Sequence, residues 1–242
     1  MTISVLVMDV AHGVAGVGTA SRSLAVGNAV PAVDPRFGVA VTQAWTNRSA
    51  GRQLLASLAD GSSVEAAVRS TLAMDLGAAF RQLAVIDREG QVAVHTGSEC
   101  SAHAAALTGP GWAVVGNLVA SHEVVKGAAR MLSVPTQPLT PTYRRAIIGL
   151  DGEANHQTVP PEVGRLGARL VATLRAAEQA GGDRRGRQSA ALRVVQLVEP
   201  GASSSSTATD IDLRVDDHPD PIGELDRLLD LLLYGPTADP SR

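Results

Sequence analysis

The sequence has one cysteine, one lysine and few aromatic residues, and each shortage excludes a class of chemistry. Cys100 alone cannot form an internal disulfide or a thiolate metal cluster. A catalytic lysine is not expected, because Lys126 is the sole candidate. Two Trp, two Tyr and two Phe offer little surface for stacking bases, and a net charge of 21 − 24 = −3 creates no field that attracts phosphates. We therefore expect no nucleic-acid partner.

Long hydrophobic runs are also missing. No apolar run reaches the ~20 residues that a membrane span needs, and the N-terminal sequence MTISVLVMDV has neither the positive region nor the cleavage site of a signal peptide. We expect a cytoplasmic protein with no membrane partner. The 242 residues, 45 % of them apolar, suit one folded domain over residues 1–242.

The hydrophobic pattern predicts short strands with helices clustered between them. Strands are expected at 2–8, 14–21, 37–45, 81–97 (a hairpin), 110–119, 190–198 and 210–215. Helices are expected at 51–60, 62–75, 121–131, 161–181 and 222–233. Because the helices do not alternate strictly with the strands, we predict antiparallel sheets covered by helices. We interpret the proline-rich residues 133–161 as an irregular surface excursion or a lid, and residues 234–242 as a tail.

Thr2 is the first candidate for catalysis. A small residue after the initiator Met normally leads to removal of Met1, and the mature chain would then begin with a threonine that opens a strand. Such a residue carries both a nucleophile, Oγ, and a base, an α-amine with a pKa of about 8. The alternative is an ordinary first residue, because many chains begin Met-Thr by chance.

The segment GGDRRGRQSAAL, residues 181–192, is the second candidate. A helix C-cap followed by a solvated turn explains it about as well. The functional interpretation places Asp183, Gln188 and Ser189 at the start of a strand, facing a cleft. The neighbouring cations, Arg184 among them, would hold a carboxylate or pair with Asp183.

Polar residues at the ends of other strands add further candidates. Ser21 and Arg22 follow the second strand, and the side chain of Asn117 suits an oxyanion. The acidic segment RVDDHPDP lacks the second His or Cys cluster that would complete a metal site, so capping of the final helix by Asp220 explains it better. No phosphate-binding glycine motif is present. We expect no metal and no cofactor.

Several segments, in their order and spacing, resemble a bacterial and archaeal family known only as domain of unknown function 1028. They are MTISVLVMD, GTASRSLAVGNAVP, AVTQAWTN, GNLVA, GGDRRGRQSAALRVV and DLRVDDHPDP. The resemblance runs from residue 2 to about residue 233. It implies an N-terminal-nucleophile (Ntn) hydrolase-like fold, which is an α+β, four-layer αββα sandwich of two antiparallel sheets flanked by helices. In that superfamily the residue that opens the first strand is the nucleophile, and here that residue is Thr2.

The resulting hypothesis is hydrolysis of a C–N (amide) bond in a small, non-peptide, carboxylate-bearing molecule. Thr2 attacks the carbonyl, Arg22 lowers the pKa of the amine or binds an anionic group, and Asn117 stabilises the oxyanion. Asp183 and Ser189 orient the amine. The predicted substrate-binding residues are Ser21, Thr42, Gln43, Asn47, Arg184 and Gln188.

Two other functions stay open on the same fold. One is a non-catalytic ligand-binding or scaffold protein, and the other is a cyclohydrolase or isomerase that forms no covalent intermediate. The final helix also carries more apolar surface than one contact stripe needs, which suggests a homo-oligomer. The leucines that form this apolar surface are Leu225, Leu228, Leu229, Leu232 and Leu233.

Overall fold

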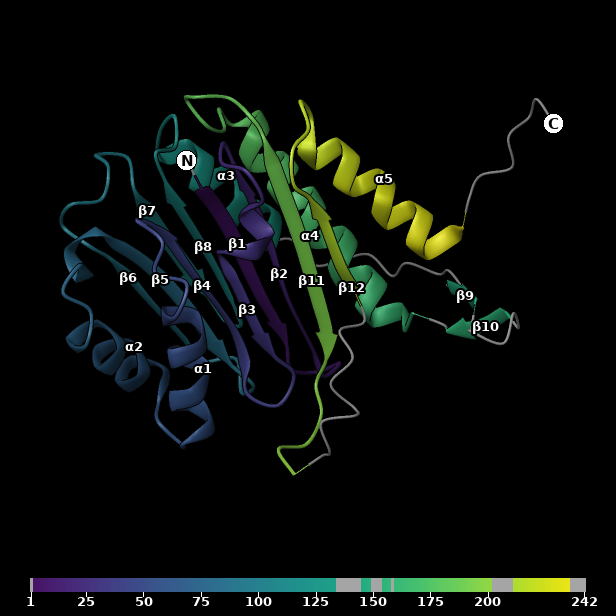
Figure 1. Cartoon of the computed structure of the whole chain (residues 1–242), viewed down its shortest axis with the longest axis horizontal. Coiled ribbons are helices and arrows are strands. Elements are labelled where there is room, and N and C mark those ends of the chain that lie inside the picture. Colours follow the sequence, from purple (N-terminus) through teal and green to yellow (C-terminus); the bar gives the residue numbers. More distant parts are fainter. Residues whose placement is uncertain (1, 134–144, 149–153, 158, 202–210, 236–242) are drawn as a thin grey trace.

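Two antiparallel sheets form the centre of the computed structural model (Figure 1). The structure describes residues 2–133, 145–148, 154–157, 159–201 and 211–235. The six-stranded sheet has the order β12-β11-β2-β1-β8-β7, and the four-stranded sheet has the order β3-β4-β5-β6. The strands of the larger sheet are β12 (Ile211–Val215), β11 (Ser189–Gln196), β2 (Val14–Ser21), β1 (Thr2–Asp9), β8 (Trp112–Asn117) and β7 (Ala105–Gly109). Those of the smaller sheet are β3 (Pro31–Asp34), β4 (Gly38–Ala44), β5 (Arg81–Asp87) and β6 (Val92–Thr96).

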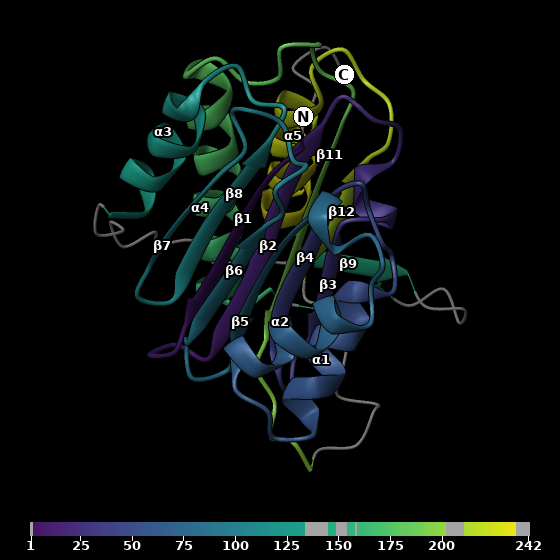
Figure 2. The ribbon, with the colours of Figure 1, turned by 90° about the vertical axis from the view of Figure 1, so that its left-hand side faces the viewer.

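Helices cover the outer face of each sheet (Figure 2). The larger sheet packs against α3 (His122–Ser133), α4 (Pro161–Gln179) and α5 (Pro221–Tyr234). The smaller sheet packs against α1 (Ala50–Ala59) and α2 (Val64–Ala73). A third apolar cluster, which includes Leu6, Val17, Val41 and Ile86, fills the space between the sheets. The predicted arrangement of antiparallel sheets covered by helices is confirmed in this form.

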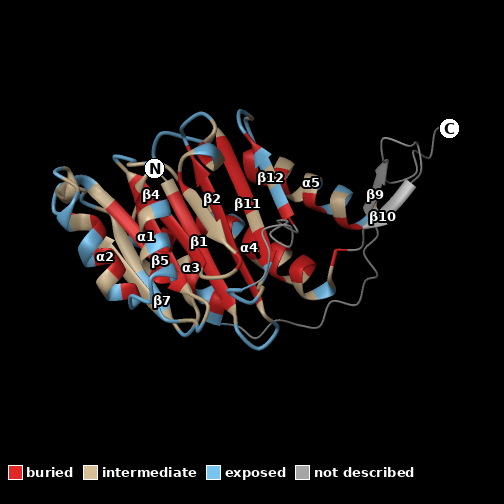
Figure 3. Ribbon diagram, turned by 60° about the horizontal axis from the view of Figure 1, so that its bottom comes forward, coloured by how far each residue is buried: buried red, intermediate tan, exposed pale blue. Residues whose placement is uncertain are grey.

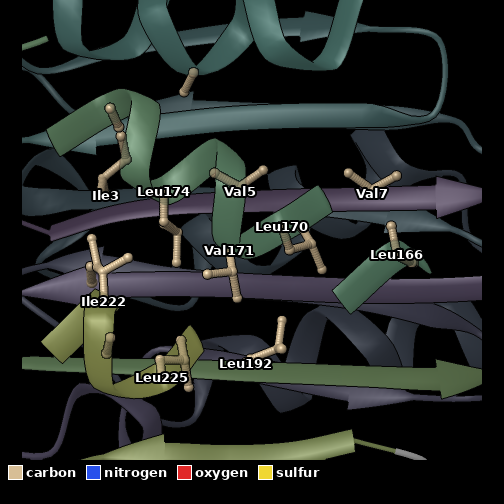
Figure 4. Packing of buried hydrophobic residues seen from close by; sticks show 14 of the residues in the cluster. Ile3, Val5, Val7, Leu166, Leu170, Val171, Leu174, Leu192, Ile222 and Leu225 are labelled. Carbon is tan, nitrogen blue, oxygen red and sulfur yellow. The ribbon is translucent and has the colours of Figure 1, made fainter. Parts of the chain in front are cut away.

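Strand β1 lies in the interior because both of its faces are apolar along most of its length (Figure 3). The side chains of successive residues of a strand point to opposite faces. Ile3, Val5 and Val7 therefore face the helices, where Leu170 and Leu174 of α4 meet them (Figure 4). The alternate residues of β1 face the smaller sheet, and those nearest its start are polar.

Glycines let α4 approach the larger sheet closely. A Cβ atom at Gly16 would lie 2.7 Å from Leu170 Cδ1, and one at Gly18 would lie 3.1 Å from Leu174 Cδ1. The leucines of the helix thus occupy space that side chains on β2 would otherwise fill. This contact fixes the height of α4 above the sheet.

Most of the predicted elements are present, with some corrections. The predicted strand at 110–119 is shorter, Trp112–Asn117, and β3 and β7 were not predicted. Residues 133–161 were expected to be irregular, yet they contain the antiparallel strands β9 (Arg145–Ile148) and β10 (Ala154–Gln157). Much of that segment and most of the predicted tail at 234–242 lie outside the described residues, so the lid stays a prediction.

Helix α5 begins at the N-cap that the sequence predicts, and its leucines pack inside the molecule. The carboxylate of Asp220 accepts a hydrogen bond from the N–H of Gly223 at 3.3 Å, which is the predicted N-cap. The leucines whose abundance suggested an oligomer all pack against the molecule's own core: Leu225, Leu228, Leu229, Leu232 and Leu233. The homo-oligomer therefore stays a prediction without support from this helix. No helix within the described ranges is long and apolar enough to span a membrane.

The close contact between β2 and α4 generates a prediction about stability. Gly16→Ala should lower the free energy of unfolding by about 1–3 kcal/mol, because its methyl group meets Leu170 Cδ1. Leu170→Ala should lower it by about 2–5 kcal/mol through the cavity it leaves. In the double variant the new methyl group enters the vacated space, so the loss should be smaller than the sum of the two single losses. Urea unfolding of the four proteins measures this coupling.

The control for this cycle is Leu231→Ala, which truncates a leucine of α5 that is 41 % exposed. When Leu231→Ala is combined with Gly16→Ala, the loss in free energy of unfolding should equal the sum of the two single losses. Equal coupling in the two cycles would contradict the proposed contact.

Candidate functional site

Thr2 lies at the end of β1 between two neighbouring strands. In the sheet register it is opposite Ser21 of β2 on one side and Asn117 of β8 on the other. Its Oγ1 is 3.1 Å from Ser21 Oγ, and the residue is partly exposed. The structure thus brings three predicted site residues, Thr2, Ser21 and Asn117, to one end of the larger sheet. That end lies near the N label in Figure 1.

The orientation of the Asn117 amide is fixed by its neighbour Ser101. Asn117 Oδ1 accepts hydrogen bonds from the Ser101 N–H at 3.3 Å and from the Ser101 hydroxyl at 3.0 Å. A backbone N–H can only donate, so the amide oxygen must face Ser101. Asn117 Nδ2 then points elsewhere, and it has no hydrogen-bond partner among the residues that the structure describes. This N–H group is available as a donor beside Thr2.

A buried polar network on the side of the smaller sheet holds the backbone of Thr2. Gln43 Nε2 donates to the carbonyl oxygen of Thr2 at 3.1 Å and to Gln82 Oε1 at 2.7 Å. Gln43 Oε1 accepts from the Ser4 hydroxyl at 2.7 Å, and the Ser4 Oγ is 3.0 Å from Thr19 Oγ1. All four of these supporting side chains are buried. Gln43, predicted to bind substrate, therefore contacts Thr2 through the main chain.

Gln82 continues the network into the smaller sheet and across to the larger one. Its Nε2 lies within hydrogen-bond distance of Thr96 Oγ1 at 3.1 Å, the Ala105 carbonyl at 3.2 Å and the Gly116 carbonyl at 3.1 Å. Every polar side-chain atom of the two glutamines has a hydrogen-bond partner. The network therefore rigidifies this end of the sandwich and leaves neither buried amide unpaired.

Residues 181–189 come back to the same end of the larger sheet. Asp183 forms an isolated bridge with Val119, two residues beyond Asn117, and its side chain is only 3 % exposed. Burial alone would raise the pKa of this carboxyl, but hydrogen bonds that include those from Arg185 hold it below its ordinary value. Asp183 is thus a buried carboxylate in its charged form at neutral pH. It also lines a small cavity of about 20 Å³, roughly one water molecule in size, with Ile3 and Ser21.

The other residues predicted on this segment lie further out or make structural contacts. The Ser189 hydroxyl donates to the Ser23 carbonyl and accepts from the Val26 N–H at 3.1 Å, so it anchors the turn after β2. Arg22 donates to Gln188 Oε1 at 2.6 Å, and Gln188 Nε2 donates to an exposed Asp217. Arg184 is exposed.

Two predicted substrate-binding residues do not reach Thr2. Thr42 follows a residue of the inter-sheet cluster, Val41, so its side chain points to the opposite face of β4, and its buried Oγ1 has no hydrogen-bond partner among the described residues. Asn47 Nδ2 donates to Asp75 Oδ2 at 2.9 Å. Asp75 also accepts from Arg81 Nε at 2.8 Å, and these two side chains are 10 % and 19 % exposed.

Strained backbone is concentrated at this end of the sandwich. Among the described residues, Ala25, Ala44 and Leu118 are the non-glycine residues with positive φ, at 54°, 71° and 59°. Leu118 follows Asn117 directly, Ala44 ends β4 next to Gln43, and Ala25 belongs to the turn that Ser189 anchors. Such conformations cost about 1–3 kcal/mol each and cluster at functional sites. Their distribution supports a site at the ends of β2, β4 and β8.

Sequence reasoning missed four residues of this arrangement: Ser4, Thr19, Gln82 and Ser101. The alternation of β1 was the available signal for Ser4, since the face that carries Leu6 and Met8 begins with polar residues. Gln82 and Ser101 meet their partners only through tertiary contacts. The described residues contain no group of three or more His, Cys, Asp or Glu side chains that would hold a metal ion.

The buried network generates a prediction about stability. Gln43→Met keeps the side-chain length but removes the amide that bonds to the Thr2 carbonyl, the Ser4 hydroxyl and Gln82 Oε1. We expect the free energy of unfolding to fall by about 2–4 kcal/mol. The matched control is Gln91→Met at an exposed position, which should change stability by less than about 0.5 kcal/mol. Equal effects in chemical denaturation would contradict the network.

The Asp75–Arg81 pair generates a pH-dependent prediction. Hydrogen bonds from Arg81 and then Asn47 hold the pKa of Asp75 well below its ordinary value of 3.8, against the effect of burial. A carboxyl with a lowered pKa stabilises the fold fully above that ordinary value, and the contribution is lost as the pH falls below it. Asp75→Asn should therefore lower the free energy of unfolding at pH 7 by about 1–3 kcal/mol.

The difference between Asp75→Asn and the wild type should shrink as the pH falls below about 4, because the wild-type contribution then disappears. Urea unfolding at a series of pH values measures it, with Asp60→Asn at the exposed end of α1 as the control. A difference that stays constant down to pH 2 would count against the pair.

Comparison with known proteins places the chain in a family. The model of a family described as "Family of unknown function (DUF1028)" matches residues 2–225. The crystal structure of a DUF1028 protein from Silicibacter pomeroyi has a TM-score of 0.73 and 29 % sequence identity, and the match covers 97 % of this chain and 91 % of that one. No curated protein matches the sequence significantly.

A much weaker likeness is to Anbu (ancestral beta-subunit) from Yersinia bercovieri. Its TM-score is 0.35 and its sequence identity is 10 %, over 94 % of this chain and 92 % of that chain. At this TM-score the likeness supports no conclusion about fold or function. The family match over residues 2–225, together with the structure from Silicibacter pomeroyi, establishes that this chain belongs to the DUF1028 family.

Proposed function

We propose that the protein hydrolyses an amide (C–N) bond in a small molecule, with Thr2 as an N-terminal nucleophile after removal of Met1. One observation carries the proposal: the hydroxyl of Thr2 lies at a partly exposed strand end beside an amide N–H of Asn117 that is free to donate. A nucleophile and an oxyanion donor in this relation are the two groups that acyl transfer needs. The Ntn hydrolase-like fold that the sequence resemblance to the DUF1028 family implies, with its nucleophile at the start of the first strand, adds support.

The reaction would run in two stages. Thr2 Oγ attacks the substrate carbonyl carbon, and the α-amine of Thr2 takes the hydroxyl proton. Asn117 Nδ2 donates to the oxyanion of the tetrahedral intermediate. The intermediate then collapses, the C–N bond breaks, and the leaving nitrogen takes the proton from the α-ammonium. Water attacks the resulting ester by the same route and releases the acid and the free threonine.

The neighbours of Thr2 would each have a defined part in this mechanism. Gln43 holds the carbonyl oxygen of Thr2 and so fixes the position of its main chain. Asp183, a buried carboxylate near Val119 and Ser21, suits the orientation of a protonated amine. Arg22 is held by Gln188 at the exposed rim, where a carboxylate of the substrate could bind.

Thr2→Ala and a β-lactone probe test the nucleophile. A β-lactone acylates an activated hydroxyl by ring opening, so intact mass should show loss of Met1 and one adduct for each wild-type chain. The adduct should map to the N-terminal peptide and be absent in Thr2→Ala. Thr108→Ala, which removes an exposed hydroxyl from β7, should keep the adduct. Retained Met1 in protein that still reacts, or full reaction of Thr2→Ala, would contradict the mechanism.

The role of Asn117 has its own measurement. Asn117→Ala should slow acylation by about 10²–10³-fold, because it removes the oxyanion donor but keeps Thr2. Acylation rates followed by mass give this ratio directly. A non-catalytic binding protein would give no adduct, and a cyclohydrolase or isomerase would turn substrate over without one.

A further inference from the structure

Two of the few aromatic side chains lie exposed and in contact with each other. The sequence has two Trp and two Phe, and Trp45 and Phe80 pair with ring centroids 6.2 Å apart in an edge-to-face arrangement. Trp45 is 70 % exposed and Phe80 is 41 % exposed. A buried aromatic side chain contributes strongly to stability, so an exposed pair in a chain this poor in aromatics calls for another role.

The backbone around Trp45 is held rigidly in place. The Trp45 N–H donates to the Phe80 carbonyl at 3.2 Å, and Arg81 Nη1 donates to the Trp45 carbonyl. Asp75 in turn fixes Arg81 through two hydrogen bonds, at 2.8 and 3.1 Å. Ala44, immediately before Trp45, has a φ of 71°. The exposed position of the indole is therefore imposed by a network of hydrogen bonds and a strained residue.

The exposed rings form one wall of a pocket. It has a volume of about 390 Å³ and is lined by Trp45, Gly77, Phe80 and Arg81. That volume lies within the range of small-molecule sites. A Cβ atom at Gly77 would lie 2.4 Å from Arg81 Nη2, so the glycine is what allows the guanidinium to lie there.

The charge balance of the pocket selects the kind of group that fits. Arg81 is the charged residue of the lining, and its guanidinium is paired with the Asp75 carboxylate. The walls thus present two aromatic faces and a neutralised ion pair. An anion would gain little here, whereas a neutral ring would stack on the indole and bury apolar surface.

Two chains of contacts connect this pocket to Thr2. Gln43 of β4 holds the Thr2 carbonyl, and Trp45 follows it by two residues, just after the end of that strand. Cys100 Sγ donates to the Arg81 carbonyl, and the next residue, Ser101, fixes the Asn117 amide. The pocket and the nucleophile therefore belong to the same end of the sandwich.

We propose that the pocket lined by Trp45, Gly77, Phe80 and Arg81 binds a neutral, ring-sized apolar group of the amide substrate. As a substrate subsite this inference rests on the proposed function. It narrows the substrate class to amides that carry an aromatic or comparably flat apolar group, in addition to any carboxylate held at Arg22.

Intrinsic fluorescence tests the pocket, because the sequence has only two tryptophans. Trp112 begins β8 and lies at the other end of that strand from Asn117. In Trp112→Phe the only indole is Trp45, and N-benzylacetamide should change its emission saturably. In Trp45→Phe the remaining indole should not respond. Adding Phe80→Ala to Trp112→Phe should weaken binding by about 5-fold.

The ring and the charge of the probe supply the controls. N-methylacetamide, which has no ring, and benzoate, which is an anion, should both bind Trp112→Phe more weakly than N-benzylacetamide. No saturable change in Trp112→Phe, or equal binding of the three probes, would overturn the proposal. The proposal would also be overturned if the emission changed with protein concentration but not with added probe. That result would show that a second copy of the chain covers the pocket.

The same titration separates this inference from the proposed function. Binding requires no turnover, so Trp112→Phe combined with Thr2→Ala should bind N-benzylacetamide unchanged. Binding without any β-lactone adduct in the wild type would contradict the nucleophile and leave the pocket established. A β-lactone adduct without saturable binding of N-benzylacetamide would contradict the pocket and leave the nucleophile established.

Discussion

The hydrogen bond between Gln43 and Gln82 is the interaction on which this end of the molecule depends. Stacked sheets are usually held together by apolar side chains, and most of the space between these two sheets is filled in that way. At one end two buried amides replace them and bond to main-chain carbonyls of Thr2, Val115, Ala105 and Gly116. Because such bonds have narrow geometry, they set the sheets at one separation and register there.

The arrangement of the sheets followed from the sequence more readily than did the contacts of the site. A short apolar, β-branched run in residues 2–8 and alternating small residues in 14–21 marked β1 and β2. The contact of Gly16 and Gly18 with α4 came from the structure. Strand β3 begins with Pro31 and is only four residues long, and β7 is half exposed, so neither has a strong local pattern. Their place was decided by pairing with β4 and β8.

The candidate site was only partly predictable for a related reason. Thr2, Ser21 and Asn117 stand at strand ends, and a correct strand order brings such residues together. The direction in which a side chain points is harder to obtain. Thr42 and Gln43 are neighbours in sequence, yet they face opposite sides of β4, and a local pattern of small and polar residues does not decide which faces the other sheet. Ser101 reaches Asn117 from a loop whose path depends on tertiary contacts.

The two-sided pairing of Thr2 has a practical consequence. Because β1 is an interior strand and its first residue is already bonded into the sheet between Ser21 and Asn117, any peptide fused ahead of it must leave through the partly exposed end of the sandwich. A purification tag at that position would start at the strand end where Thr2 lies opposite Asn117. Recombinant protein meant for ligand screening is therefore better made with its tag at the other terminus.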